Sequence, residues 1–147
     1  MGESGEKGKI GETGKFWYIN SSIKLNMKKS DKFEDLYVWK DSVALAKEIF
    51  QLFNEVRVFS IRNQIERAAV SISTNIAEGY EYGSDKQFVR FLYIAKGSCG
   101  EVRSLLLLSK ELSIFNNIQV EILVEKCSKL SIMIYKLIKV RTNGKAG

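Results

Sequence analysis

Apolar residues recur at intervals of three and four from Phe33 almost to the end of the chain. That spacing places apolar side chains on one face of an α-helix. Four segments share the pattern, and they run over about residues 33–56, 60–80, 85–112 and 116–141. The chain contains no proline, so none of these segments holds a strong helix breaker. The pattern therefore predicts four long amphipathic helices joined by short connections.

Each predicted helix has one apolar stripe that we expect to be buried. In the first helix the stripe is Leu36, Trp39, Val43, Ala46, Phe50 and Phe53. In the second it is Ile61, Ile65, Ala68, Ala69, Ile72 and Ile76. In the third it is Phe88, Phe91, Ala95, Ser98, Val102, Leu105 and Leu112, and in the fourth Leu123, Cys127, Leu130, Ile134 and Leu137. Such helices with short connections favour an all-α fold, an antiparallel up-and-down four-helix bundle.

Polar residues mark the expected helix boundaries. Ser60 is a candidate N-cap for the second helix, because a serine side chain can accept a hydrogen bond from a free backbone N–H of the first turn. Gly83, Ser84 and Asp85 end the second helix and begin the third, and Asn116 opens the fourth. The bundle is thus expected over residues 33–141, followed by a flexible tail at 142–147.

The second helix also carries a narrow polar stripe. At 100° per residue its members fit within an arc of roughly 80°, and they are Gln64, Arg67, Ser71, Asn75 and Glu78. The stripe flanks the apolar arc and should be half-exposed. The face that we expect to be fully solvent-exposed is formed by Arg62, Glu66, Ser73, Thr74 and Ala77.

Two interpretations of this stripe differ in chemistry. In the first, Glu78 and Glu101 act as an acid and base pair, Arg67 binds an anion and Ser71 is a nucleophile. A nucleophilic serine needs a nearby base, however, and the chain has no histidine. In the second, Arg67 pairs with Glu78 or Glu101, while Asn75 and Ser71 satisfy backbone groups. We favour the second, predict no catalytic residue and do not expect an enzyme.

The third helix has a second surface opposite its core stripe, made by Tyr93, Gly97, Gly100, Ser104 and Leu107. A glycine inside a helix is about 1 kcal/mol less favourable than alanine. Small residues let another backbone approach closely, so this surface is a candidate subunit interface. The alternative is internal packing against the second or fourth helix.

Basic residues line two helix edges and agree with the overall charge. The net charge is +6 and the pI is about 9.3, which favours an anionic partner, RNA or DNA before membrane. The candidates for nucleic-acid binding are Lys96, Arg103, Lys110, Lys129, Lys136 and Lys139. In one copy these residues could equally be an ordinary solvated face, whereas a ring would multiply the phosphate contacts. Because no linear recognition motif is legible, we expect contacts to the nucleic-acid backbone.

Composition excludes several other functions. Cys99 and Cys127 are too few for a zinc pattern, and each lies on an apolar helix face as a small hydrophobic residue. We therefore predict no metal and no cofactor. No run of apolar residues is long enough to span a bilayer, and the N-terminus lacks a signal-peptide pattern, so the expected location is the cytoplasm.

Residues 1–30 form a separate segment before the helical body. Glycine recurs every third residue from Gly2 to Gly14, but a collagen triple helix needs many more triplets and is normally rich in proline. Glycine and charge predict a disordered leader. Because Met27 begins a lysine-rich stretch close to the first predicted helix, we expect the leader to come from an alternative upstream start or not to be native.

Three ordered motifs give the chain a resemblance to a known family. The first, in the second helix, consists of Gln64, Arg67, Ala68, Ser71, Asn75, Ile76, Ala77, Glu78 and Gly79. The second consists of Phe91, Leu92, Ala95, Gly97, Ser98 and Glu101, and the third is Leu36 to Lys40. With these motifs the chain resembles the bacterial four-helix bundle proteins also called 23S rRNA intervening-sequence proteins, over about residues 33–141. One departure is Ser73, where relatives usually carry proline.

The resemblance implies an up-and-down bundle that assembles as a homopentamer. Many relatives are encoded within insertions in ribosomal RNA genes. One branch resembles the accessory subunit of diversity-generating retroelements, a basic barrel that binds a reverse transcriptase and nucleic acid.

Two functions remain open from the sequence. The favoured hypothesis is a non-enzymatic oligomeric scaffold whose basic surface binds nucleic acid or a ribonucleoprotein. The alternative is a protein-interaction adaptor that docks a partner such as a reverse transcriptase, in which case the basic charge is incidental.

Overall fold

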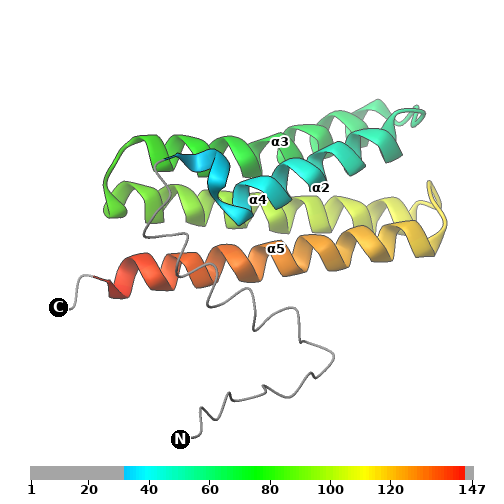
Figure 1. Cartoon of the computed structure of the whole chain (residues 1–147). Helices are drawn as coiled ribbons and strands as arrows, with labels where there is room; N and C mark the ends of the chain where they lie inside the picture. The colour runs from blue at the N-terminus through cyan, green and yellow to red at the C-terminus, as the bar shows by residue number, and fades with distance from the viewer. Residues whose placement is uncertain (1–31, 145–147) are drawn as a thin grey trace, which may run out of the picture. The chain divides into compact units, whose positions relative to one another are not determined.

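The structure, a computed structural model, describes residues 32–144, with Asn117 described by its backbone alone. A 3-10 helix η1 (Phe33–Asp35) precedes four α-helices, α2 (Tyr37–Phe53), α3 (Phe59–Glu81), α4 (Asp85–Glu111) and α5 (Asn117–Asn143) (Figure 1). Successive helices run antiparallel, which confirms the predicted all-α four-helix bundle. The predicted leader lies outside the described residues. At the other end, α5 continues two residues beyond the predicted bundle, to Asn143.

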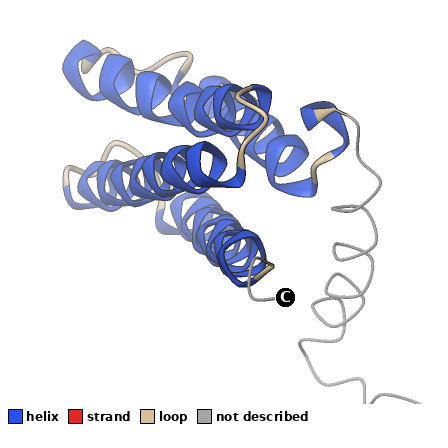
Figure 2. Cartoon of the chain, turned by 90° about the vertical axis from the view of Figure 1, so that its left-hand side faces the viewer, coloured by secondary structure: helices blue, strands red, loops and turns tan. Residues whose placement is uncertain are grey.

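The four helices are packed in the order α2, α3, α4 and α5 around a common core (Figure 2). Helix α3 packs against α2 and α4, and α5 packs mainly against α4 and more lightly against α2. Helices α3 and α5 therefore lie diagonally across the bundle. The seam between α4 and α5 faces away from α3, so the charged side chains of α3 do not line this seam.

The first predicted helix is not one continuous helix. The chain makes the short η1 turn, extends at Leu36 (φ −71°, ψ 127°) and only then enters α2. Leu36 is 4% exposed, and its carbonyl accepts the N–H groups of Trp39 and Lys40 at 3.1 Å. The break lets Leu36 point into the core while η1 packs against both α2 and α3.

The buried stripe of α2 was also mispredicted. Val43 and Phe50 are 40% and 43% exposed. The helix instead buries Val38, Ser42, Leu45, Ile49 and Phe53. Two apolar stripes lie side by side on this helix, and packing on α3 selects one of them. On α4 the same effect buries Leu106 in place of Leu112, which lies just beyond the helix end and is 53% exposed.

The predicted core faces of α3 and α5 are confirmed, as all eleven of their named residues are buried. The predicted starts of α4 and α5 are also confirmed, and each carries a side-chain cap. The Ser84 hydroxyl accepts the N–H of Gln87, and the Asn116 side-chain oxygen accepts that of Gln119, both at 3.3 Å. Gly83 precedes the first of these caps with φ 69°, a conformation that a residue without a Cβ adopts readily.

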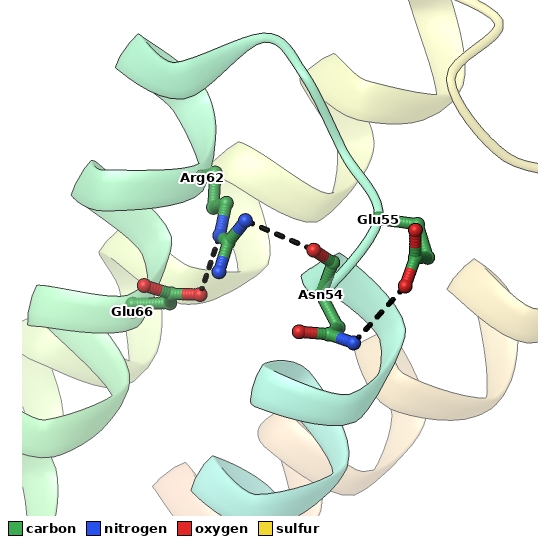
Figure 3. Close-up of polar contacts among 4 residues, drawn as sticks. All are labelled: Asn54, Glu55, Arg62 and Glu66. Carbon is green, nitrogen blue, oxygen red and sulfur yellow. Dashed lines mark hydrogen bonds and ion pairs between the residues drawn. The ribbon is translucent and has the colours of Figure 1, made fainter.

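Ser60 is not the cap of α3, because the helix starts one residue earlier with Val58 at the N-cap position. The connection from α2 is instead held by Arg62 (Figure 3). Its Nη1 donates to the carbonyl of Asn54 at 2.9 Å, and its Nε pairs with Glu66 at 3.1 Å. One of the free carbonyls at the end of α2 thus gains a donor from α3.

At the opposite end of the bundle, Arg141 holds the end of α5 against the start of α4. Its Nη1 lies 3.1 Å from the Asp85 carboxylate, and its guanidinium lies 5.3 Å from the ring centre of Phe88. No helix in the described part of the chain is long and apolar enough to cross a membrane.

Candidate functional site

The polar stripe of α3 faces α4, and its centre is a small hydrogen-bond network. The hydroxyls of Ser71 and Ser98 lie 2.9 Å apart, and Asn75 Nδ2 donates to the Ser71 hydroxyl at 2.9 Å and to its carbonyl at 2.7 Å. Ser98 also reaches the carbonyl of Ile94 at 3.2 Å. Asn75 thus makes the backbone contact that the structural interpretation predicts, whereas the Ser71 hydroxyl meets only the side chains of Ser98 and Asn75 among the described residues. No carboxylate or amine stands next to Ser71 in this network as a base.

The ends of the stripe are arranged differently from the prediction. Glu101 accepts a hydrogen bond from Gln64. Neither Arg67 nor Glu78 makes an ion pair or hydrogen bond with another residue of the range 32–144, so the expected pairing of Arg67 with a glutamate is wrong. Both side chains are exposed, and exposure removes the need for a partner because water solvates the charge. Arg67 lines a shallow hollow together with Phe50 and Val70.

The predicted interface surface lies open on the outside of α4. Tyr93 and Leu107 are 53% and 46% exposed. Nothing lies within 4 Å of the positions that Cβ atoms would take on Gly97 and Gly100. Ser104 is exposed as well. Internal packing therefore does not account for this surface, which we call the glycine face (Tyr93, Gly97, Gly100, Ser104 and Leu107).

Five of the six basic candidates fall into two groups. Lys110 pairs with Glu121 at 3.2 Å, and Lys129 pairs with Glu125 at 2.7 Å, an interaction that lowers the pKa of Glu125. Arg103 is exposed between the two groups. The others, Lys96, Lys136 and Lys139, lie where the N-terminal half of α4 runs beside the C-terminal half of α5.

Lys96 and Lys139 converge on one aromatic ring that the sequence prediction missed. The Nζ of Lys96 lies 6.0 Å from the ring centre of Tyr135, and that of Lys139 lies 5.1 Å from it. Tyr135, through a side-chain hydrogen bond and its charge, raises the pKa of Lys139, and Tyr93 adds to the effect. The raised pKa keeps the Lys139 ammonium group charged at neutral pH. The i, i+4 spacing of Tyr135 and Lys139 was a local signal, but Lys96 is far away in sequence.

Charge is strongly segregated between this region and the rest of the bundle. Residues 85–100 and 130–143 hold six basic residues and one acidic residue, Asp85, which is paired with Arg141. The other described residues hold ten basic and twelve acidic residues. We call the first region the basic half of the α4–α5 seam. The neighbouring acidic residues Glu78 and Glu81 belong to α3, diagonal to α5.

The two cysteines lie together in the core between α4 and α5. The Cys127 thiol donates to the carbonyl of Cys99 at 3.0 Å, and both residues are buried and free. The Cys127 thiol and burial raise the pKa of Cys99. This is a packing arrangement of small apolar groups. In the range 32–144 no three side chains of the metal-binding types lie together.

Fold and surface together define a small all-α bundle with a polar network between α3 and α4, an open glycine face and a one-sided basic seam. The chain belongs to the family of 23S rRNA-intervening sequence proteins, whose model matches residues 34–136. A solved structure of a protein of unknown function from the S23 ribosomal protein family of Bacteroides thetaiotaomicron is similar to it, with 26% identity and a TM-score of 0.66. The match covers 69% of this chain and 98% of that one. The comparison with curated proteins gives no match.

Proposed function

We propose that the protein is a non-enzymatic scaffold that binds RNA or DNA through the phosphate backbone, with the basic half of the α4–α5 seam as the contact surface. The observation that carries the proposal is the charge segregation. The seam is strongly positive, whereas the rest of the described bundle is slightly negative. A positive surface on a near-neutral body attracts and orients a polyanion.

The arrangement of the lysines supports contact with phosphates. Lys96 and Lys139 come from neighbouring helices and point to the same ring, so one phosphate could meet both ammonium groups. Neither is paired with a carboxylate among the described residues, and the surrounding sequence segments contain only Asp85 as an acid. Lysines recognise phosphate as a charge and not as a base sequence. Binding should therefore depend little on sequence.

We expect the double substitution Lys96→Gln and Lys139→Gln to weaken RNA binding at low salt by tenfold or more. The salt dependence of the affinity should also become shallower, by about one in log–log slope for each lysine. Fluorescence anisotropy with a labelled RNA across a potassium chloride series measures both quantities.

The double substitution Lys40→Gln and Lys47→Gln is the matched control. It removes the same charge from exposed positions of α2, outside the seam, and should change the affinity much less. Equal losses from the two pairs would show that only net charge matters. Absence of binding to any RNA at low salt would reject the proposal.

A second candidate function, the protein-interaction adaptor, rests on the apolar residues of α4 that remain exposed. Leu107 and Leu108 are 46% and 44% exposed beside the glycine face, and Leu112 follows them. Such a surface suits a helix of a second copy or of a partner such as a reverse transcriptase. We propose self-association through the part of this face that Gly97, Gly100, Ser104 and Leu107 form, with Tyr93 outside the contact, as the family resemblance implies for a homopentamer.

For self-association, light scattering should give a mass several times that of one chain. Gly97→Leu should reduce that mass at micromolar concentration, because a large side chain prevents close helix approach. The fold should persist, since nothing in the described chain lies within 4 Å of a Cβ at this position. A monomeric wild-type protein would rule out the interface.

A further inference from the structure

Tyr93 differs from Tyr82, another exposed tyrosine of the bundle. Tyr82 is 57% exposed, but its ring is stacked on Phe91, with 5.3 Å between centres and 22° between planes. Tyr93 is 53% exposed, and no aromatic ring packs on it within the part of the chain that the structure describes. An exposed tyrosine ring that no other ring covers is a surface on which a planar group can stack.

The surroundings of Tyr93 are basic. It precedes Lys96 by one helical turn, and side chains on a helix lean toward its N-terminus, so the ring lies over the start of α4. Lys86 and Arg90 are the charged residues there, besides Asp85, which Arg141 neutralises.

Tyr93 also lies close to the lysine pair on the seam. Tyr93 and Lys96 are three residues apart on α4, so their side chains are neighbours on the helix surface, and Lys96 and Lys139 meet at the Tyr135 ring. The four residues Tyr93, Lys96, Tyr135 and Lys139 thus form one surface group, which we call the tyrosine–lysine cluster. Within it the Tyr135 ring is already engaged by two ammonium groups. The Tyr93 ring is the one that remains available.

We propose that the tyrosine–lysine cluster binds one nucleotide of a single strand, with its phosphate at Lys96 and Lys139 and its base stacked on Tyr93. This inference rests on the proposed function and adds a preference for single strands over duplexes. A lysine pair accepts phosphates from either form. A base inside a duplex is covered on both faces by its neighbours, however, and only an unpaired base can present a face to Tyr93.

The size of the preference follows from stacking. Stacking of a base on an aromatic side chain changes affinity by roughly five- to 150-fold when the ring is removed. Every base has a flat face, so the preference for single strands should not become a preference for sequence. The linear sequence does not reveal this site, because Tyr93 and Tyr135 lie on different helices and neither belongs to a run of aromatic residues.

The test compares a labelled 20-nucleotide RNA with a duplex of the same sequence, by anisotropy at one low salt concentration. We expect the wild-type protein to bind the single strand more tightly. Tyr93→Ala should lower single-strand affinity by about tenfold or more and leave duplex affinity nearly unchanged. Tyr93→Phe should retain the preference, since it keeps the ring. Lys96→Gln with Lys139→Gln should weaken binding of both forms.

Tyr37→Ala is the matched control, because Tyr37 is also exposed and has a lysine, Lys40, at 5.9 Å, but lies on α2 outside the seam. It should leave both affinities unchanged. Equal binding of single strand and duplex by the wild type, or full single-strand affinity in Tyr93→Ala, would overturn the inference and leave the proposed function standing. A changed oligomeric mass in Tyr93→Ala would assign Tyr93 to a subunit interface and also overturn it. Absence of binding to both forms would reject both.

Discussion

Replacing Phe53 by alanine is expected to lower the free energy of unfolding by about 3–5 kcal/mol. Phe53 is the last residue of α2 and is fully buried, and its ring meets that of Phe115 edge to face, with 4.9 Å between centres. Phe115 belongs to the connection between α4 and α5. The substitution therefore removes a large side chain and also the contact that joins the end of α2 to the opposite pair of helices.

This loss is a large part of the roughly 5–15 kcal/mol by which a small domain is stable. Phe50→Ala is the control, because Phe50 lies one turn earlier but is 43% exposed. Its truncation should lower stability by only about 1 kcal/mol. Urea unfolding followed by circular dichroism measures both variants. A larger loss for Phe50→Ala than for Phe53→Ala would mean that α2 is rotated about its axis relative to the structure.

Gly79→Ala is expected to be the second strongest of the single substitutions considered, with a loss of about 1–3 kcal/mol from overpacking. A Cβ at Gly79 would lie 2.5 Å from Cβ of Phe91 and 3.3 Å from Cδ2 of Phe88. The Cβ of Phe91 is fixed to the α4 backbone and cannot swing away, so α3 and α4 would have to separate. The gain of about 1 kcal/mol that alanine brings within a helix offsets only part of this.

The glycine face provides the comparison with opposite sign. Gly100→Ala meets no neighbouring atom in the described chain and should raise stability by about 0.5–1 kcal/mol. Thermal unfolding of the two variants under one set of conditions compares them directly. If Gly79→Ala were as stable as Gly100→Ala, the close approach of α3 and α4 at Gly79 would be refuted.

The polar network between α3 and α4 shows how far a single sequence can be interpreted. Ser71 and Asn75 are four residues apart on one helix, so their hydrogen bond follows from helical spacing. Spacing within α3 cannot show which residues of α4 these side chains contact. In the structure the Ser71 hydroxyl forms a hydrogen bond with Ser98, and Glu101 accepts one from Gln64 and not from Arg67.

The sequence by itself determined the features that depend on residues within about one helical turn of each other. The three- and four-residue period predicted the number of long helices and the buried faces of α3 and α5. Breaks in the apolar pattern placed the starts of α4 and α5 near Ser84 and Asn116, which the structure shows as caps. Local hydrogen bonds and side-chain spacing along one helix suffice for these features.

Only the tertiary structure decided which of two neighbouring apolar stripes α2 buries, and that the similar helical glycines Gly79 and Gly97 have opposite surroundings. It also brought Lys96 to Tyr135 while neutralising Lys110 with Glu121. Each of these depends on the rotation of a helix about its axis and on its register against its neighbours. Those quantities are set by the simultaneous packing of all four helices, which no local pattern contains.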